Sequence, residues 1–281
     1  MANYTYLVPP FTTTTFTSPV AGTDDVITAN VLADFTINGN GGNDVVRTAG
    51  GNDTITTGSG NDVIAAGNGN NTVTAGDGTN AVTTGSGDDT ITTGTGADVV
   101  NSGSGNDIIT TGGGNDRINS GGGNDSIKSG GGNDRIISGG GNDKVNAGTG
   151  NDRITAGGGI DALIGGGGHD TFVYARLADA RLGADTISDF STSNPTGAGE
   201  GDMLYLQGLV DDFTGLQGGS LAQLVPSGHF DFSAGGGGTV ISFDSNGSAA
   251  GGSIGVLATL VGVPFTNEGA SALAFGDNIL V

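Results

Sequence analysis

The chain has 281 residues, with 59 glycines, eight lysines and arginines, no cysteine and a formal net charge of −21. The negative charge argues against nucleic acid and anionic lipid as partners, because both require clustered lysine and arginine, and it favours multivalent cations. The lack of cysteine excludes a disulfide scaffold and thiol chemistry. No stretch approaches the length of an apolar transmembrane helix.

Residues 1–38 precede the regular part of the chain. The opening MANYTYLVPPFTTTTF has neither the basic region nor the apolar core of a secretory signal. Residues 1–20 are rich in β-forming threonine and are interrupted by Pro9, Pro10 and Pro19, which allows either a flexible tail or an added strand. Residues 22–40, GTDDVITANVLADFTINGN, have the character of a degenerate coil, so we expect this segment to cap the repeats that follow.

Fifteen nonapeptides run from Gly39 to Val173 without an insertion. Each has glycine at its fourth position and an aliphatic residue or Phe172 at its eighth. The sixth position is asparagine in two repeats, Asn71 and Asn80, and aspartate in the other thirteen, which are Asp44, Asp53, Asp62, Asp89, Asp98, Asp107, Asp116, Asp125, Asp134, Asp143, Asp152, Asp161 and Asp170.

The nonapeptide predicts a turn followed by a short strand. Its first six residues favour turns and its last three favour strand. The eighth residue is expected to face inward and its two neighbours outward, because side chains alternate along a strand. One inward side chain per nonapeptide cannot be buried alone, so two nonapeptides should form one coil of 18 residues. Stacking such coils about 4.8 Å apart predicts an all-β solenoid with two parallel sheets and a thin core.

Stacking also places the sixth residues in two columns of turns. Carboxylates about 5 Å apart repel by roughly 1 kcal/mol per neighbour in water and more where water is excluded. Calcium would remove this repulsion, because it binds carboxylate and backbone carbonyl oxygens together. We therefore predict that the thirteen aspartates bind multiple Ca²⁺ ions. Asn71 and Asn80 put full occupancy in doubt on both columns, and Asp77 is a candidate substitute ligand.

This segment resembles the RTX, or haemolysin-type, calcium-binding repeat. The resemblance implies a right-handed parallel β-roll over residues 39–173. The sequence departs from the usual motif at the first position, which is mostly threonine, serine or alanine instead of glycine.

Residues 174–281 have a different pattern, with GDMLYLQGL, GTVISFDSNG and GVLATLVGV before a final GDNILV. This region resembles the C-terminal target region of type I secreted proteins. The resemblance implies export by the type I secretion machinery without a cleaved N-terminal signal, and an extracellular or cell-surface location. The alternative is an ordinary β-rich cap that ends on an edge strand.

No enzyme motif accompanies the repeats. The only histidines are His169 and His229, and G-x-S-x-G, H-E-x-x-H and P-loop motifs are absent. RTX enzymes generally carry a separate catalytic domain before the repeats, and the 38 residues found there are too few for one. We therefore expect that the protein is not an enzyme.

The outward residues next to the sixth position differ between the two predicted sheets. One sheet carries an aliphatic ladder and then an arginine ladder, Val45, Val63, Ala81, Val99, Arg117, Arg135 and Arg153. These residues are either an interaction surface or ordinary strand formers, with arginines that balance nearby carboxylates. The other sheet carries three Thr-x-Thr rungs, which begin at Thr54, Thr72 and Thr90. Flat threonine arrays resemble those of ice-binding solenoids, although threonine also simply favours strands.

The sequence favours a secreted, calcium-dependent β-roll with a structural, self-assembling or adhesive role, such as a surface layer or matrix fibre. Self-association is expected through the Val45–Val99 ladder and through residues 5–20, which could add a strand to a neighbouring molecule. The alternative function is an extracellular module that binds polysaccharide or ice.

Overall fold

The structure is a computed structural model that describes residues 2–6, 13–18, 20–174, 184–191, 201–206, 230–235, 238–244, 254–261 and 279–280. Every regular element in these ranges is a β-strand. The chain forms two compact units, residues 1–139 and 140–281, and each is described by itself. The predicted all-β parallel solenoid is confirmed.

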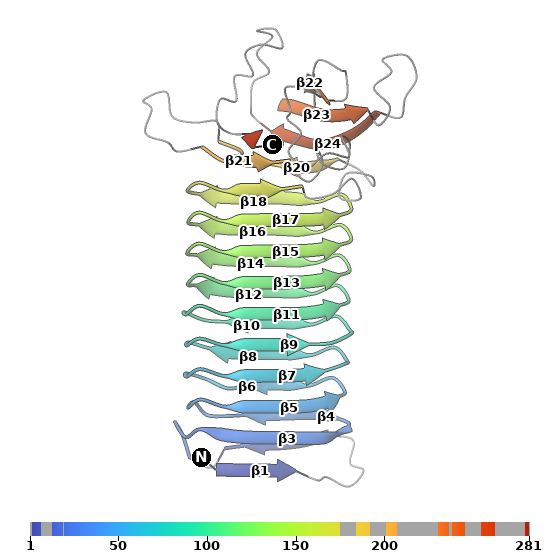
Figure 1. The fold of residues 1–281 in the computed structure, drawn as a ribbon. Coiled ribbons are helices and arrows are strands. Elements are labelled where there is room, and N and C mark those ends of the chain that lie inside the picture. Colours follow the sequence, from blue (N-terminus) through green and yellow to red (C-terminus); the bar gives the residue numbers. More distant parts are fainter. Residues whose placement is uncertain are drawn as a thin grey trace, which may run out of the picture. The chain divides into compact units, whose positions relative to one another are not determined.

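The first unit is a stack of coils in which the chain alternates between two parallel sheets (Figure 1). One sheet consists of β1 (Ala2–Tyr6), β3 (Asp25–Leu32), β5 (Val45–Gly50), β7 (Val63–Gly67), β9 (Ala81–Thr84), β11 (Val99–Ser104), β13 (Arg117–Gly122) and β15 (Arg135–Gly140). The other consists of β2 (Thr13–Thr17), β4 (Asp34–Asn38), β6 (Thr54–Thr56), β8 (Thr72–Gly76), β10 (Thr90–Thr93), β12 (Ile108–Gly113) and β14 (Ser126–Gly131).

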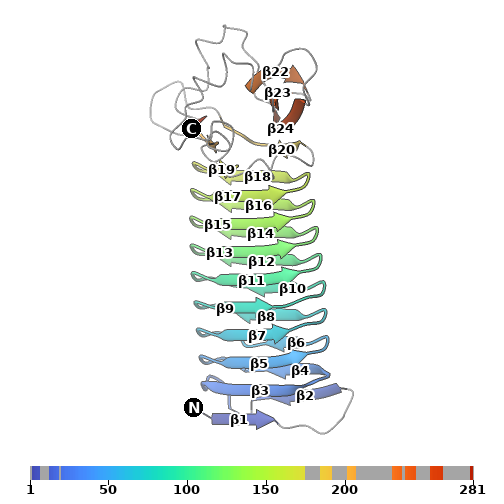
Figure 2. The same cartoon turned by 45° about the vertical axis from the view of Figure 1, so that its right-hand side comes forward.

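Strand pairing in the repeats joins residues that are 18 positions apart. Val46 pairs with Ile64 in one sheet, and Ile55 pairs with Val73 in the other. The predicted 18-residue coil is therefore present, with one nonapeptide in each sheet. Figure 2 shows the successive coils at an oblique angle, with β5, β7 and β9 stacked in one sheet and β4, β6 and β8 stacked in the other.

Three side chains of each repeat face inward, instead of the single one expected. The eighth residue forms the apolar core, as Ile55, Ile91 and Ile109 show. The sixth residue of a repeat and the first residue of the next repeat, such as Asp53 and Thr57, are buried as well. The reason is the alternation of side chains along a strand, which places the residues two before and two after the eighth on the same face.

The N-terminal segment adds strands to its own chain. Strand β1 pairs in parallel with β3, and β2 pairs in parallel with β4. Of the two possibilities left open for residues 1–20, the structure therefore shows the added strand. These two strands occupy the edges that the degenerate coil of residues 22–40 would otherwise expose.

The second unit continues the alternation and then leaves it. One sheet contains β17 (Arg153–Gly158), β19 (Thr171–Val173), β21 (Met203–Tyr205) and β25 (Ile279–Leu280). The other contains β16 (Lys144–Thr149), β18 (Ala162–Gly167), β20 (Asp185–Ile187), β24 (Ile254–Val261), β23 (Gly238–Asp244) and β22 (Phe230–Gly235). Pairing is parallel up to β24, and β24, β23 and β22 then pair antiparallel.

Candidate calcium site

The sixth residues form a hydrogen-bonded ladder inside the turns. All thirteen predicted aspartates are buried, with 0–2% of each residue exposed. One carboxylate oxygen, Oδ1, accepts a hydrogen bond from the backbone N–H of the sixth residue one coil earlier. Examples are the N–H of Asp44 to Asp62 at 2.7 Å and the N–H of Asp89 to Asp107 at 2.8 Å. Each column is therefore held by backbone and side chain together.

The second carboxylate oxygen has no such donor. In the described part of the chain, Oδ2 is buried without a hydrogen-bond partner in at least nine of the predicted ligands, namely Asp44, Asp53, Asp62, Asp89, Asp98, Asp107, Asp116, Asp161 and Asp170. A buried carboxylate oxygen is strongly destabilising unless a donor or a cation compensates it. Because the same unsatisfied oxygen recurs in coil after coil, we interpret these turns as a repeated ligand-binding site.

The two asparagine rungs show what faces this second oxygen. The side-chain amide nitrogen of Asn71 donates to the carbonyl oxygens of Gly67 at 3.2 Å and Gly69 at 2.9 Å. These glycines hold the second and fourth positions of their repeat. In the aspartate repeats the equivalent atom is an oxygen, so carboxylate and carbonyl oxygens come together with no hydrogen between them. This arrangement requires a cation or a proton.

A hydroxyl group lies beside several of these carboxylates but does not satisfy them. The hydroxyls of Thr84 and Thr93 lie close to the carboxylates of Asp89 and Asp98, whose pKa is raised by burial. A hydroxyl has only one hydrogen to donate. Thr84 gives its hydrogen to the carbonyl of Ser102 in the next coil at 2.7 Å. These buried hydroxyls therefore tie neighbouring coils together and leave the carboxylates in need of a cation.

The electrostatics of the metal-free site favour protonation. Burial, and then the like charges of neighbouring aspartates, raise the pKa of Asp44, Asp107 and Asp170 to about 6 from an ordinary 3.8. Burial also raises the pKa of Asp53, Asp62 and Asp161. At neutral pH the columns thus hold carboxylates that are costly to ionise, and a divalent cation would offset this cost.

Calcium fits the oxygens that the turns provide. No group of three or more acidic or histidine side chains converges within the described residues, and the asparagine rungs place backbone carbonyl oxygens beside the position of the second carboxylate oxygen. Calcium accepts carboxylate and backbone carbonyl oxygens in flexible geometry. The turn glycines allow the carbonyls to face the site. Gly60, at the fourth position before Asp62, has a φ of 134° that side chains disfavour.

Three ladder members lie outside the nonapeptide count. Asp25 donates its N–H to Asp44, and the columns continue from Asp161 to Asp185 and from Asp170 to Asp202. All three are followed two residues later by an aliphatic residue, so the D-x-aliphatic pattern could have found them. Asp185 and Asp202 were not predicted, because they follow Asp161 and Asp170 by 24 and 32 residues and these insertions break the period of nine.

Asp202 differs from the repeat aspartates in its hydrogen bonds. One carboxylate oxygen accepts from the N–H of Asp170, and the other accepts from the N–H of Ser191 at 2.8 Å. Backbone donors therefore reach both oxygens, which suits a residue that ends a column.

Asp77 does not replace the missing carboxylate of Asn80. Its side chain is exposed and accepts hydrogen bonds from the N–H and hydroxyl of Thr95, which lower its pKa. The prediction of a substitute ligand was wrong, because the third position of the repeat lies on the outside of the turn. The fifth position forms an outer ladder of its own, in which the N–H of Asn61 donates to the side chain of Asn43 at 2.8 Å.

Comparison with known protein families matches the RTX calcium-binding nonapeptide repeat in four copies, at residues 38–73, 74–109, 110–145 and 137–172. Residues 38–172 are RTX calcium-binding repeats. RTX repeat proteins are typically secreted, and the β-roll matches the fold described above. A search of curated proteins found no significant match over the chain. Among the described residues, no helix has the length and apolar character to span a membrane.

Proposed function

We propose that this RTX protein is a secreted structural β-roll whose copies associate, in the presence of calcium, at the cell surface or in the extracellular matrix. The observation that carries the proposal is an exposed apolar column on the outer face of the first unit. Calcium completes the interior of the roll, and the outer faces of the two sheets remain for contact with partners.

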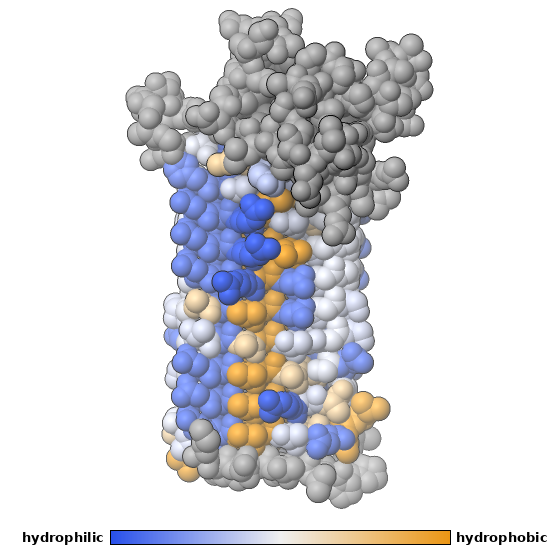
Figure 3. All heavy atoms as spheres, in the orientation of Figure 1, coloured by the Kyte–Doolittle hydropathy of each residue, from blue (hydrophilic) through white to orange (hydrophobic). Residues whose placement is uncertain are grey.

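The apolar column consists of Val45, Val63, Ala81 and Val99, which pair in register on neighbouring strands. Val63 and Val99 are 44% and 45% exposed. Figure 3 shows the column as an orange stripe with hydrophilic residues along one side and paler, less polar residues along much of the other. A continuous exposed apolar stripe on an otherwise strongly acidic chain is typical of an interaction surface.

A second copy of the chain is the occupant that we propose for this column. The same column on another copy offers a matching apolar surface of equal length, and calcium bound to the carboxylates reduces the repulsion between two chains of charge −21. Exchange of residues 5–20 is no longer needed for this contact, because β1 and β2 pair with their own chain. We therefore propose lateral association through the sheet face.

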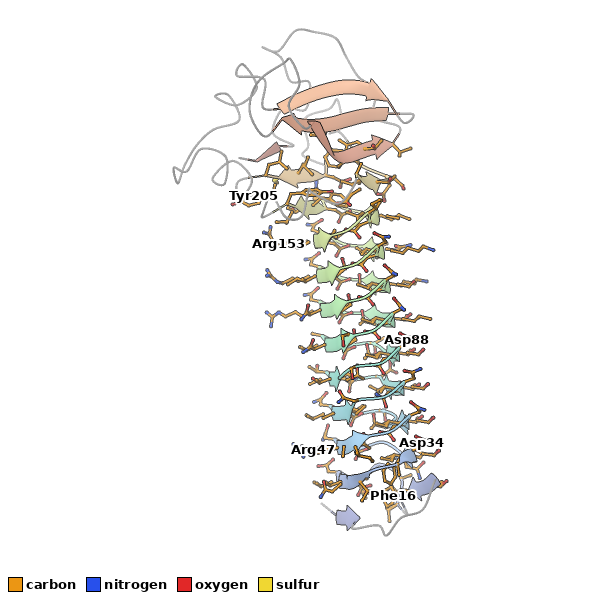
Figure 4. All side chains as sticks on the ribbon, turned by 90° about the vertical axis from the view of Figure 1, so that its right-hand side faces the viewer. Phe16, Asp34, Arg47, Asp88, Arg153 and Tyr205 are labelled. Atoms are coloured by element: carbon orange, nitrogen blue, oxygen red, sulfur yellow. The ribbon has the colours of Figure 1, made fainter. Side chains whose placement is uncertain are left out.

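The arginines beyond the column support an exposed interaction surface over local charge balance. Arg117 follows Val99 in register on the next strand and is exposed. The neighbouring carboxylate of Asp116 is buried on the opposite face of the strand. Figure 4 likewise shows Arg47 projecting from the outer side of one sheet, whereas Asp34 and Asp88 project on the opposite side.

Export by a type I secretion system remains part of the proposal. Support comes from the RTX repeats and from the acidic and aliphatic pattern of residues 174–281. Much of that region lies outside the described residues.

Sedimentation velocity and light scattering with and without calcium test the structural function. We expect calcium-dependent assembly, which the double variant Val63→Thr, Val99→Thr weakens. Ile108→Thr is the matched control, because Ile108 is 53% exposed but lies on the other sheet. A protein that stays monomeric at every calcium concentration would contradict a structural role.

A second candidate function, binding of ice or polysaccharide, is favoured by the threonine array. Strand pairing adds two threonines to the three predicted rungs, because Thr36 pairs with Thr54 and Thr15 pairs with Thr36. A flat array of hydroxyls and methyl groups suits ordered water or sugar rings. Thermal hysteresis and glycan-binding assays test this function. Thr72→Tyr should abolish either activity, and Thr83→Tyr on the opposite sheet should preserve it.

A further inference from the structure

We infer that Asn71 and Asn80 are metal-free rungs, in which a side-chain amide occupies the place that calcium holds beside the aspartates of neighbouring coils. The inference rests on the calcium binding of the proposed function. It implies that the two asparagine rungs separate the calcium sites that precede them from those that follow. It goes beyond a weakened site, because it assigns to these two residues a bonding role of their own.

The hydrogen bonds of Asn71 account for its whole amide group. Its Oδ1 accepts from the N–H of Asp53 at 3.1 Å, as an aspartate would. Its Nδ2 donates to the carbonyls of Gly67 and Gly69. An NH₂ group has two hydrogens, and the two carbonyls use both. The rung is therefore complete without a cation.

Asn80 repeats this arrangement on the other column. Its Nδ2 donates to the carbonyls of Gly76 at 3.0 Å and Gly78 at 3.2 Å, and its Oδ1 accepts from the N–H of Asp62 at 3.0 Å. The carbonyls at the second and fourth positions are those that would otherwise bind calcium. An amide that bonds to both carbonyls places its hydrogens between the oxygens, where a metal would otherwise bind, and supplies no negative charge.

The first position of the repeat provides an independent observation. From Thr48 to Ser129 every first residue is threonine or serine, except Ala66 and Ala75, which precede Asn71 and Asn80. Within this range, repeats with aspartate at the sixth position have a hydroxyl at the first position, and the two repeats with asparagine at the sixth position do not. The pairing is limited to these repeats, because Gly39 before them and Ala147 and Ala156 after them precede aspartates.

The two amide rungs occur in consecutive nonapeptides, one on each column. Together they make a segment from Gly67 to Asn80 in which both turns are closed by hydrogen bonds alone. Calcium can fill the aspartates before this segment, such as Asp44 and Asp62, independently of those after it, such as Asp89 and Asp98. In the absence of calcium, this segment has no buried carboxylate oxygen that lacks a compensating charge or donor.

Conversion of the asparagines to aspartate tests the assignment by a gain of metal. Calcium per chain is measured by equilibrium dialysis for the full chain and for the double variant Asn71→Asp, Asn80→Asp. We expect the variant to bind at least one additional calcium ion. We also expect a higher calcium concentration at the midpoint of folding, because two more buried carboxylates must be neutralised. An unchanged stoichiometry together with an unchanged midpoint would overturn the inference.

Asp62→Asn is the reciprocal variant. It should bind fewer calcium ions and should reach the midpoint of folding at a lower calcium concentration, because an amide can donate to the carbonyls of Gly58 and Gly60 and one buried carboxylate fewer must be neutralised. A midpoint at a higher calcium concentration than that of the wild type would show that an amide does not replace the metal. A wild-type chain that folds without binding calcium would defeat the proposed function, and hydrogen exchange at this turn in the two folded chains would then still decide whether an amide closes it.

Discussion

The inward and outward positions of the nonapeptide differ in how strictly they repeat. Inward, the sixth position is aspartate or asparagine in all fifteen repeats, the eighth is Val, Ile, Leu or Phe, and the first is always one of the small residues Thr, Ser, Ala and Gly. Outward, the seventh position ranges from Val63 to Thr72 and Arg117, and it follows a different trend on each sheet. The inside of the roll thus carries the core and the candidate metal ligands, and the outside carries the side chains that vary from coil to coil.

This difference has a physical origin. An inward side chain contacts equivalent residues in the coils above and below, so a change in one coil must fit both neighbours. An outward side chain meets solvent on one side and only its in-register neighbours along the sheet. Perturbation of inward positions should therefore alter folding, and perturbation of outward positions should alter association while the fold persists.

Removal of calcium should have the largest effect. Without metal, the buried second oxygens of residues such as Asp53 and Asp107 are uncompensated. A ligand at 100 times its dissociation constant contributes about 2.7 kcal/mol per site, so a few sites match the whole stability of an ordinary domain. Circular dichroism should show loss of most β-structure in EGTA and its recovery on addition of calcium. A complete β-signature in EGTA would contradict calcium-dependent folding.

A methyl group at Gly60 should have the next largest effect. Gly60 has a φ of 134°, and a Cβ there would overlap the carbonyl oxygen of Gly42 in the neighbouring coil. We expect Gly60→Ala to lower the free energy of unfolding by at least about 2 kcal/mol in saturating calcium. Gly113→Ala is the control, because a Cβ at Gly113 would meet only one carbonyl oxygen, 4.0 Å away. Chemical denaturation should separate the two variants, and equal losses would show that the turn does not need glycine.

Acidification should partly replace calcium in the inward columns. The pKa values of Asp44, Asp107 and Asp170 are raised to about 6 in the fold. Because the folded state then binds protons more tightly than the unfolded chain, the stability of the calcium-free protein should rise as the pH falls from 8 to 5 and should be lost as the pH rises through 6. Circular dichroism of protein dialysed free of calcium, in buffers without EGTA, measures the β-structure across this range. Lower stability at pH 5 than at pH 8 would refute it.

A conservative change on the outside should have the smallest effect. Thr90 is exposed at the seventh position, next to the buried Ile91. We expect Thr90→Val to change the free energy of unfolding by less than about 0.5 kcal/mol. Ile91→Ala should cost about 2–5 kcal/mol, because it leaves a cavity in the thin core. Similar losses for both variants would remove the distinction between the two faces.

Much of the fold and of the candidate site could be predicted from the sequence, because an uninterrupted period of nine relates each residue to its neighbours in space. The spacing from Asp44 to Asp170 places these residues in two columns, and the pairing of Val46 with Ile64 confirms the coil length. The period could not reach Asp185 and Asp202, because insertions separate them from the preceding coils.

The sequence by itself determined the coil, the two columns and the chemistry of the ligands, since all three follow from local turn preferences and a constant spacing. Only the tertiary structure decided how each polar atom is used. It placed β1 and β2 on their own chain, turned Asp77 outward, and directed the amide of Asn71 to the carbonyls of Gly67 and Gly69. These outcomes depend on which donors and acceptors meet when one coil packs on the next, and a period in the sequence does not specify those contacts.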